Sequence, residues 1–404
     1  MNTKWLKFAW LNTLRNRRRS AVTVGIAALG TAAILLAGGF ALFTYQGLAQ
    51  ISARTTGHLI VAKPAHFQRD EDTPLQNGLD DVAAIRAKLL TDPDVRQVLP
   101  RVEFTGLISN GDKSTVMMAA GIDPDAEFAI KGPFLRITAG KVLTSDQRAH
   151  VMLGEGLARS LKAAPGASLT LLASTTEGAL NALDVTVQGV FSTGIPDVDK
   201  RLVYTDVVTA QKLLVTQRVT SLGVFLRSMD ATQPAQVRIA AAHPQLAVQT
   251  WLDQATFYKS VKELYNRIFG ALGLIIGVIV VFVVTNAMAM AIIERTREIG
   301  TLRAMGTLPV QLTRSFALEG MVLGGAGALL GAGIALAVSI ALLVFPVEMP
   351  PPPGRSNGYP LQIAIDATLY AGTLLAMVAL SMLASAFVAR RTVAKPVVDA
   401  LAHV

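Results

Sequence analysis

The sequence contains no cysteine, and only 16% of its 404 residues are charged. The absence of cysteine excludes a disulfide-stapled scaffold, a thiol nucleophile, an iron–sulfur cluster and cysteine-ligated zinc. Soluble domains carry about a quarter charged residues. The shortage of charge, together with a 51% hydrophobic content, therefore argues against a globular cytosolic enzyme.

The missing charge is concentrated in four stretches that contain no Asp, Glu, Lys or Arg. Each stretch exceeds the roughly 20 apolar residues that cross a hydrocarbon core of about 30 Å as a helix. A soluble core helix is rarely longer than about 20 residues and normally has a polar face. The sequence therefore predicts an α-helical membrane protein with four transmembrane helices, at residues 21–53, 268–293, 320–347 and 367–389.

A basic N-terminal segment, residues 1–20, precedes the first of these helices, as it would in a signal peptide. The apolar part of a signal peptide is about 7–15 residues long, and this stretch is roughly twice that length. We therefore expect it to be a retained membrane anchor.

The positions of lysine and arginine predict the orientation in the membrane. The N-terminal segment has six basic residues and no acidic one, residues 294–319 contain four arginines, and the tail at 390–404 has three basic residues. The loop at 348–366 has only Arg355. Both termini and residues 294–319 are therefore expected in the cytoplasm, and residues 54–267 on the other side.

The exported region carries 23 of the 37 basic residues and 22 of the 28 acidic ones, so it is nearly neutral. The net charge of +9 comes from residues that flank the membrane helices. A basic nucleic-acid-binding surface is therefore not expected.

Within the exported region, residues 54–250 have the pattern of a mixed α/β domain, and residues 251–267 are expected to extend the second membrane helix as a stalk. Turns are expected at Asn110–Asp112 and Ala164–Gly166. The predicted strands are 58–62, 115–122, 168–173, 185–191, 201–204 and 222–226, and the predicted helices are 79–90, 154–161, 207–214 and 234–242.

Catalytic motifs are missing from the exported region. The five histidines are far apart and show no HExxH pairing, and no GxSxG motif occurs. The acidic run Asp70–Asp72 is interpreted as a solvated loop, not as a metal site. The chain also lacks the GxxxxGK[ST] loop that cradles nucleotide phosphates, so we expect no enzymatic activity and no metal.

The most informative stretch is ERTREIGTLRAMG at residues 294–306. On a helix, Ile299, Leu302 and Met305 form an apolar ridge, and Gly306 can end that helix. A short amphipathic helix beside a membrane helix suits either of two roles. It can plug into a groove of a partner protein, or it can lie on lipid headgroups, and its residues leave both open.

This stretch closely resembles the coupling segment of permeases of the FtsX/MacB type, the mechanotransmission class of ABC transporters. Ala389–Arg391 and Lys395–Val397 resemble the usual ending of that family. The order of one span, a large domain and three spans also agrees. Three motifs resemble the MacB periplasmic core domain: Pro100-Arg101, Gly121–Pro124 and Leu153–Ala158.

The resemblance implies a permease in the bacterial inner membrane that pairs with a second copy or a paralogue and binds a separate ABC ATPase, as in the LolC/LolE permeases. ATP and Mg would be bound by the ATPase, and no cofactor by this chain. Membrane lipid and a periplasmic carrier or adaptor would be further partners. The implied ATPase-coupling residues are Glu294, Arg295, Arg297, Glu298, Ile299, Leu302, Arg303, Met305 and Gly306.

Small residues in the predicted spans allow close helix packing, either between two chains or within one. The run Pro350–Pro353 is interpreted either as a stiff linker or as an arm that braces the exported domain or touches a partner. The candidate packing glycines are Gly25, Gly30, Gly38, Gly39, Gly324 and Gly331, with Gly320, Gly327 and Gly333 also in the third span.

The leading functional hypothesis is export, or release from the membrane, of a lipoprotein, lipid or hydrophobic compound, driven by ATP hydrolysis on the partner. The alternative is an FtsX-type signalling adaptor that activates a cell-wall hydrolase without transport. The exported domain of about 200 residues favours transport, because adaptors of that type have a smaller one. A receptor without any ATPase is disfavoured by the coupling segment.

Overall fold

A computed structural model describes residues 17–68, 75–131, 135–350 and 358–393. The chain separates into two compact units. Of the described residues, one unit contains those up to Gln46, Val261–Glu348 and those from Pro360 onward, and the other contains those within Gly47–Ser260 and Met349–Tyr359.

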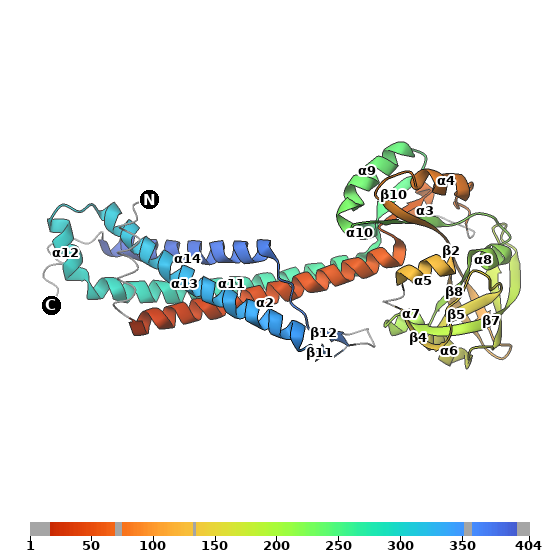
Figure 1. The fold of residues 1–404 in the computed structure, drawn as a ribbon, viewed down its shortest axis with the longest axis horizontal. Coiled ribbons are helices and arrows are strands. Elements are labelled where there is room, and N and C mark those ends of the chain that lie inside the picture. The colour runs from red at the N-terminus through yellow and green to blue at the C-terminus, as the bar shows by residue number, and fades with distance from the viewer. Residues whose placement is uncertain (1–16, 69–74, 132–134, 351–357, 394–404) are drawn as a thin grey trace. The chain divides into compact units, whose positions relative to one another are not determined.

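The first unit is helical, and its long helices are coloured red, cyan and blue in Figure 1. Within the described residues, four helices are long and apolar enough to cross a membrane, which confirms the predicted membrane class. They are α2 (Arg17–Thr56), α11 (Thr256–Glu294), α13 (Pro309–Val344) and α14 (Ala367–Val393), and the short α12 (Thr296–Ala304) follows α11.

Three of these helices are much longer than a membrane requires. The 40 residues of α2, the 39 of α11 and the 36 of α13 give lengths of about 54–60 Å, nearly twice a hydrocarbon core. The segment 294–319 is also more helical than a loop, because α13 begins at Pro309. Proline is favoured at the first position of a helix, where its missing N–H has no partner to lose.

The start of the stalk differs from the expectation that residues 251–267 form one helix. Trp251–Gln254 form a separate turn, α10, and the continuous helix starts at Thr256. Thr250 and Asp253 close a capping box around α10, and Ala255 has φ −83° and ψ 63°, which is not helical. Trp251 is 9% exposed and packs edge-on against Tyr258 with ring centroids 5.1 Å apart.

The second unit is a mixed α/β domain. Its strands are β1 (Leu59–Ala62), β2 (Val95–Ser109), β3 (Ser114–Ile122), β4 (Arg136–Gly140), β5 (His150–Gly154), β6 (Ser168–Ser174), β7 (Leu180–Ser192), β8 (Leu202–Asp206), β9 (Ser221–Leu226) and β10 (Ala247–Thr250). Its other helices are α3 (Pro64–Gln68), α4 (Val82–Leu89), α5 (Pro124–Lys131), α6 (Glu155–Leu161), α7 (Pro196–Asp199), α8 (Val207–Leu214), the 3₁₀ turn η2 (Met229–Ala231) and α9 (Thr232–Ala242).

Six of these strands form a closed ring. Strands β2, β3, β8, β5, β7 and β6 pair in this order, and β6 pairs back with β2. Closure leaves these strands without a long free edge. Along β6, Leu169, Leu171 and Ala173 are buried and alternate with more exposed residues, as a strand with one face on a core requires.

Strand β2 links this ring to a smaller sheet. Its last eight residues pair with β3, whereas Val95–Arg101 pair with β9, beyond which lie β1 and β10. The expected hairpin is present after β2: the Asn110 N–H donates to the Lys113 carbonyl at 3.1 Å, and Gly111 has φ +92°.

Several segments that the sequence singled out lie wholly or partly outside the described residues. They are residues 1–16, Asp70–Asp72, Pro351–Pro353, and the tail from Ala394. Around the proline run, the two-residue strands β11 (Glu348–Met349) and β12 (Tyr359–Pro360) pair with each other.

Candidate functional site

The stretch at residues 294–306 contains the short helix α12, which is bounded by two breaks. Arg295, with φ −109° and ψ 15°, separates α11 from α12, and the Thr296 hydroxyl donates to the carbonyls of Ile292 and Ile293. At the other end Gly306 has φ +97°, and the Thr307 N–H donates to the Leu302 carbonyl at 3.0 Å. Glycine adopts this left-handed backbone without strain, so α12 ends where the sequence predicts.

The predicted apolar ridge is divided between two environments. Ile299 is 6% exposed and belongs to the buried cluster of the helical unit, with Ile292 and Phe316. Leu302 is 37% and Met305 71% exposed. Ile299 therefore anchors α12 to the helices, whereas the other two side chains are available to a partner.

Two further apolar side chains beside this helix are not among the predicted site residues. Leu308 and Val310 flank Pro309 and are 60% and 59% exposed. The signal that could have found them is their position between two predicted helices, outside any span. Together with Leu302 and Met305 they form the exposed apolar segment, four apolar side chains within nine residues.

The charged residues at 294–306 also lie in two different environments. Glu294, Arg297 and Glu298 are exposed. Arg295 is turned inward, and its Nη1 lies 3.3 Å from Oε1 of Glu319 in α13. The side chains of this pair are only 15% and 7% exposed. Glu319 was not among the predicted site residues, because it stands alone at the edge of a charge-free run.

Most of the candidate packing glycines contact other helices of the same chain. A Cβ atom at Gly30 would lie 3.0 Å from Ile276, and one at Gly38 would lie 3.1 Å from Leu369. Gly39 accepts a hydrogen bond from the Ala364 N–H at 3.0 Å. Gly324 packs on Ser381 of α14 and Gly331 on Ala28 and Thr31 of α2, whereas a Cβ atom at Gly25 would meet nothing within 4 Å.

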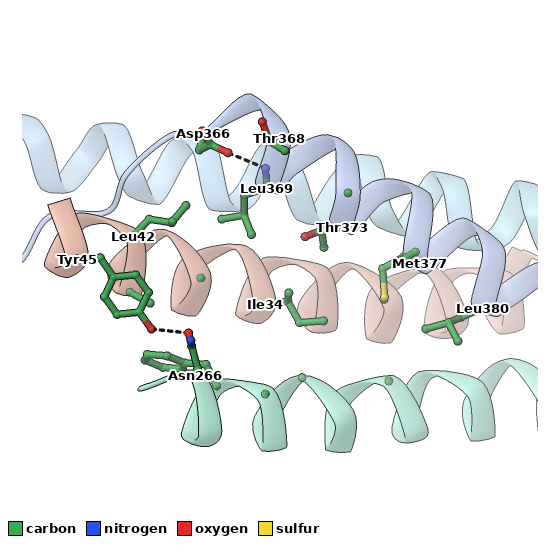
Figure 2. A pocket seen from close by; sticks show the side chains of 18 residues that line it. Ile34, Leu42, Tyr45, Asn266, Asp366, Thr368, Leu369, Thr373, Met377 and Leu380 are labelled. Atoms are coloured by element: carbon green, nitrogen blue, oxygen red, sulfur yellow. Dashed lines mark hydrogen bonds between the residues drawn. The ribbon is translucent and has the colours of Figure 1, made fainter. Parts of the chain in front are cut away.

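A groove of about 670 Å³ lies among α2, α11 and α14 (Figure 2). Its walls are almost entirely apolar. Gly270 and Gly273 of α11 and Gly372 of α14 line it, and a Cβ atom at any of them would meet nothing within 4 Å. The glycines therefore leave open space along the groove. The sequence carried a signal for it in Gly270, Gly273 and Gly277, at helical spacing on one side of α11.

The groove has most of its polar side chains at one end, and Thr373 is a further polar residue midway along it (Figure 2). At that end the Tyr45 hydroxyl donates to Oδ1 of Asn266 at 2.8 Å, and Oδ1 of Asp366 accepts from the Leu369 N–H at 2.8 Å (Figure 2). Met377 and Leu380 lie toward the other end. Such a groove matches an amphiphile, with a polar head at Tyr45 and Asn266 and an apolar body along the glycines.

Ionisable groups in the α/β unit form structural pairs. Arg101 and Glu127, 6% and 1% exposed, lie 2.5 Å apart. Two hydrogen bonds from Arg238 lower the pKa of Asp92 below its ordinary range, and the same contacts raise the pKa of Arg238. Within the described residues, no group of three or more His, Asp or Glu side chains is placed to hold a metal ion. These pairs connect elements within the α/β unit, and they do not have the geometry of a catalytic centre.

Comparison with known proteins covers both units. A model of the MacB-like periplasmic core domain matches residues 20–242, more than half of the chain, and a model of the FtsX-like permease C-terminal region matches residues 270–397. Both matched regions therefore agree with the order of α/β domain and membrane helices described above.

Among curated proteins, the chain is 26% identical over 276 residues to the lipoprotein-releasing system transmembrane protein LolE of Haemophilus influenzae, which covers 65% of this chain and 66% of that protein. It is 25% identical over 253 residues to LolC of Xylella fastidiosa, covering 61% of each. The chain thus matches less than two thirds of the length of these relatives.

Solved structures of similar domains include the periplasmic region of MacB from Actinobacillus actinomycetemcomitans. It is 16% identical, with a TM-score of 0.36, and covers 50% of this chain and 92% of that one. The extracellular domain of the ABC-type transporter YknZ is also 16% identical, with a TM-score of 0.35, and covers 48% and 98% of the two chains.

Proposed function

Because the chain belongs to the FtsX/MacB family of ABC transporter permeases, we propose that it is the permease subunit of a transporter whose ATP is hydrolysed by a separate ATPase. ATP and Mg bind to that partner. ATP hydrolysis moves the ATPase, and the permease relays this movement to its α/β unit. The relayed movement drives release of a lipoprotein, lipid or hydrophobic compound from the membrane. The names of the LolE and LolC relatives, as parts of a lipoprotein-releasing system, favour the first of these substrates.

The observation that carries the proposal is the exposed apolar segment beside a helix anchored to the bundle. Leu302 and Met305 project from α12, and Leu308 and Val310 follow further along the chain. Covering exposed apolar surface favours association, so an apolar groove of the ATPase would bind this segment. Anchoring through Ile299 would pass the motion of the ATPase to the membrane helices.

The proposed orientation puts this segment in the cytoplasm of a bacterial cell, where ATP is available. It rests on the arginines of residues 294–319 and on the basic ends of the chain. The α/β unit then lies in the periplasm, in agreement with the match to a periplasmic core domain.

The groove among α2, α11 and α14 is the proposed substrate site. Its volume of about 670 Å³ lies within the ordinary range for ligand sites. In the proposed orientation its polar end, marked by Tyr45, Asn266 and Asp366, faces the periplasm. An acylated substrate would place its chains along the glycines and its polar head at these side chains.

We also propose that two permease chains pair in the membrane. The support is the open face of α11, where Leu274, Val278 and Phe282 are exposed. A pair of chains would enclose the groove, which one chain leaves open on one side.

Co-purification of the ATPase with variants of the permease tests the docking role. Met305→Glu and Leu302→Glu would each bury an unpaired carboxylate, which costs several kcal/mol, and 1.4 kcal/mol is already tenfold in affinity. We therefore expect the amount of bound ATPase to fall by about tenfold or more, with membrane insertion unchanged. Arg314→Glu, on an exposed position of α13, is the control and should change binding much less.

If both glutamate variants bind the ATPase as well as the parent does, α12 is a helix that lies on lipid and not a docking element.

A release assay in proteoliposomes distinguishes transport from signalling. ATP-dependent transfer of an acylated substrate to an acceptor supports the permease, whereas ATP turnover without any transfer supports the adaptor function.

A further inference from the structure

The ion pair between Arg295 and Glu319 is placed where two helices change direction. Arg295 is the non-helical residue between α11 and α12, and its carbonyl accepts the first hydrogen bond of α12, from the Ile299 N–H at 3.0 Å. Its guanidinium reaches α13, 24 positions further along the chain. Arg295, which lies at the bend between α11 and α12, therefore forms an ion pair with a third helix, α13.

Glu319 lies on the buried face of α13. It shares that face with Leu312, Phe316 and Leu323, and the residue itself is 5% exposed. A buried ion pair contributes little net stability, because removing both charges from water costs about as much as their attraction returns. The pair therefore calls for a role other than stability.

The contacts around the pair fasten α12 to α13 on two sides. Ile299, one turn from Arg295, packs into the same buried cluster as Leu312 and Phe316. At its far end α12 connects through Gly306 and Leu308 directly to the first residue of α13. A push on the exposed side of α12 thus reaches α13 through the ion pair and through the chain itself.

From α13 the contacts continue to two other helices. Gly320 and Gly324 pack against Ser385 and Ser381 of α14, and further along α13 Gly327 lies against Ala27 of α2. Helices in such close contact cannot shift independently, because side-chain space between them is lacking. Helix α2 is unbroken from Arg17 to Thr56, and its last residues belong to the α/β unit.

We propose that Arg295 and Glu319 are positioning residues, a buried clasp that makes α12 and α13 move as one body. The source of the motion, a bound ATPase, rests on the proposed function. The clasp sends that motion through α13 to α2 and α14, in addition to the direct path along α11. Arg295 then acts inside the permease and does not contact the ATPase, unlike its exposed neighbour Arg297.

Distance measurement between two spin labels tests the clasp in the full chain without any ATPase. The chain has no cysteine, so Thr301→Cys on α12 and Leu329→Cys on α13, both exposed, give one labelled pair within each chain. We expect one narrow distance in the otherwise unchanged protein and an additional shifted distance in Glu319→Gln. The exchange Arg295→Glu with Glu319→Arg should restore the narrow distance, because the pair is re-formed.

Arg297→Gln is the matched control, since it removes an arginine two residues away that is exposed, and it should leave the distance unchanged. A single unchanged distance in Glu319→Gln, or a charge exchange that fails to restore it, would overturn the clasp. Since Glu319→Gln keeps the size of the side chain, a folded variant is available even where charge reversal is not tolerated.

The complex with the ATPase provides a second readout. Glu319→Gln should leave ATPase binding unchanged and lower the amount of substrate released per ATP by about tenfold, within the usual range of coupling free energies. Equal release per ATP in the variant and the parent would also contradict the clasp. The spin-label distance is measured without the ATPase, so it tests the clasp even if Met305→Glu shows that the ATPase does not dock on α12. Failure of the clasp and failure of the proposed docking are therefore distinguishable.

Discussion

At the scale of single residues, the surroundings of His58 favour the neutral form of its side chain. It follows the last turn of α2 and precedes β1, and its Nδ1 accepts a hydrogen bond from the Leu226 N–H at 3.2 Å. Burial, and after it the positive charge of Arg54, lowers the pKa of His58 below the ordinary 6.5. The neutral form of the His58 ring is thus the one favoured in its site beside β1 and β9.

Acidification should lower the stability of the folded state around His58. Between the lowered pKa of the folded state and 6.5, the unfolded chain binds a proton that the folded chain resists, so stability falls as the pH drops through this window and is constant above it. We expect hydrogen exchange of the Leu226 amide, corrected for intrinsic rates, to accelerate below pH 6.5.

His58→Gln provides the comparison for this prediction. Its amide oxygen can accept the same hydrogen bond and does not titrate, so exchange at Leu226 should lose its pH dependence. Equal pH dependence in the variant and the parent would assign the effect to another group.

At the scale of elements, α13 is organised by the spacing of its glycines. Gly320 and Gly324 face α14, and Gly327 and Gly331 face α2. Gly333, in the same helix, is exposed, and a Cβ atom there would meet nothing within 4 Å. One helix therefore uses glycine for close packing on two sides, while another of its glycines has no such role.

Alanine substitutions should separate these positions. In Gly324→Ala the new methyl group would overlap the Ser381 side chain, and we expect a loss of about 1–3 kcal/mol in the free energy of unfolding. Gly333→Ala should be neutral or stabilising by up to about 1 kcal/mol, because alanine is the better helix former. Unfolding of the purified protein in detergent measures both.

At the scale of the whole molecule, function depends on the side of the membrane on which each unit lies. The proposed orientation places the turn between β6 and β7 in the periplasm and α12 in the cytoplasm. Glu177 in that turn and Arg297 on α12 are both exposed, so each can carry a label without disturbing a core.

Labelling of single cysteines tests this orientation in cells. The parent chain has no cysteine, so a membrane-impermeant maleimide should react with Glu177→Cys in cells with a permeabilised outer membrane, and with Arg297→Cys only after the inner membrane is opened. The opposite pattern would contradict the orientation and, with it, access of the exposed apolar segment to a cytoplasmic ATPase.

The sequence alone determined the membrane class and many of the elements, but it did not predict strands β2, β4, β5 and β10. Charge-free runs longer than a bilayer's thickness predict helices whatever their neighbours are, because lipid leaves the backbone no other hydrogen-bond partner. In the α/β unit the local pattern identified helix α8 (Val207–Leu214) with its observed bounds. The Asn110–Asp112 turn was equally local, since glycine permits its left-handed backbone.

Only the tertiary structure decided what the side chains of these elements face. The three residues of the α12 ridge share one spacing, yet Ile299 is buried and Met305 exposed, because the neighbouring α13 covers just one end of the ridge. The long strand β2 and the ring it closes depend on partners far along the chain, which no local pattern specifies. The pairing of Arg295 with Glu319 likewise required the return of α13 beside α12, since only burial next to each other makes two distant charges a pair.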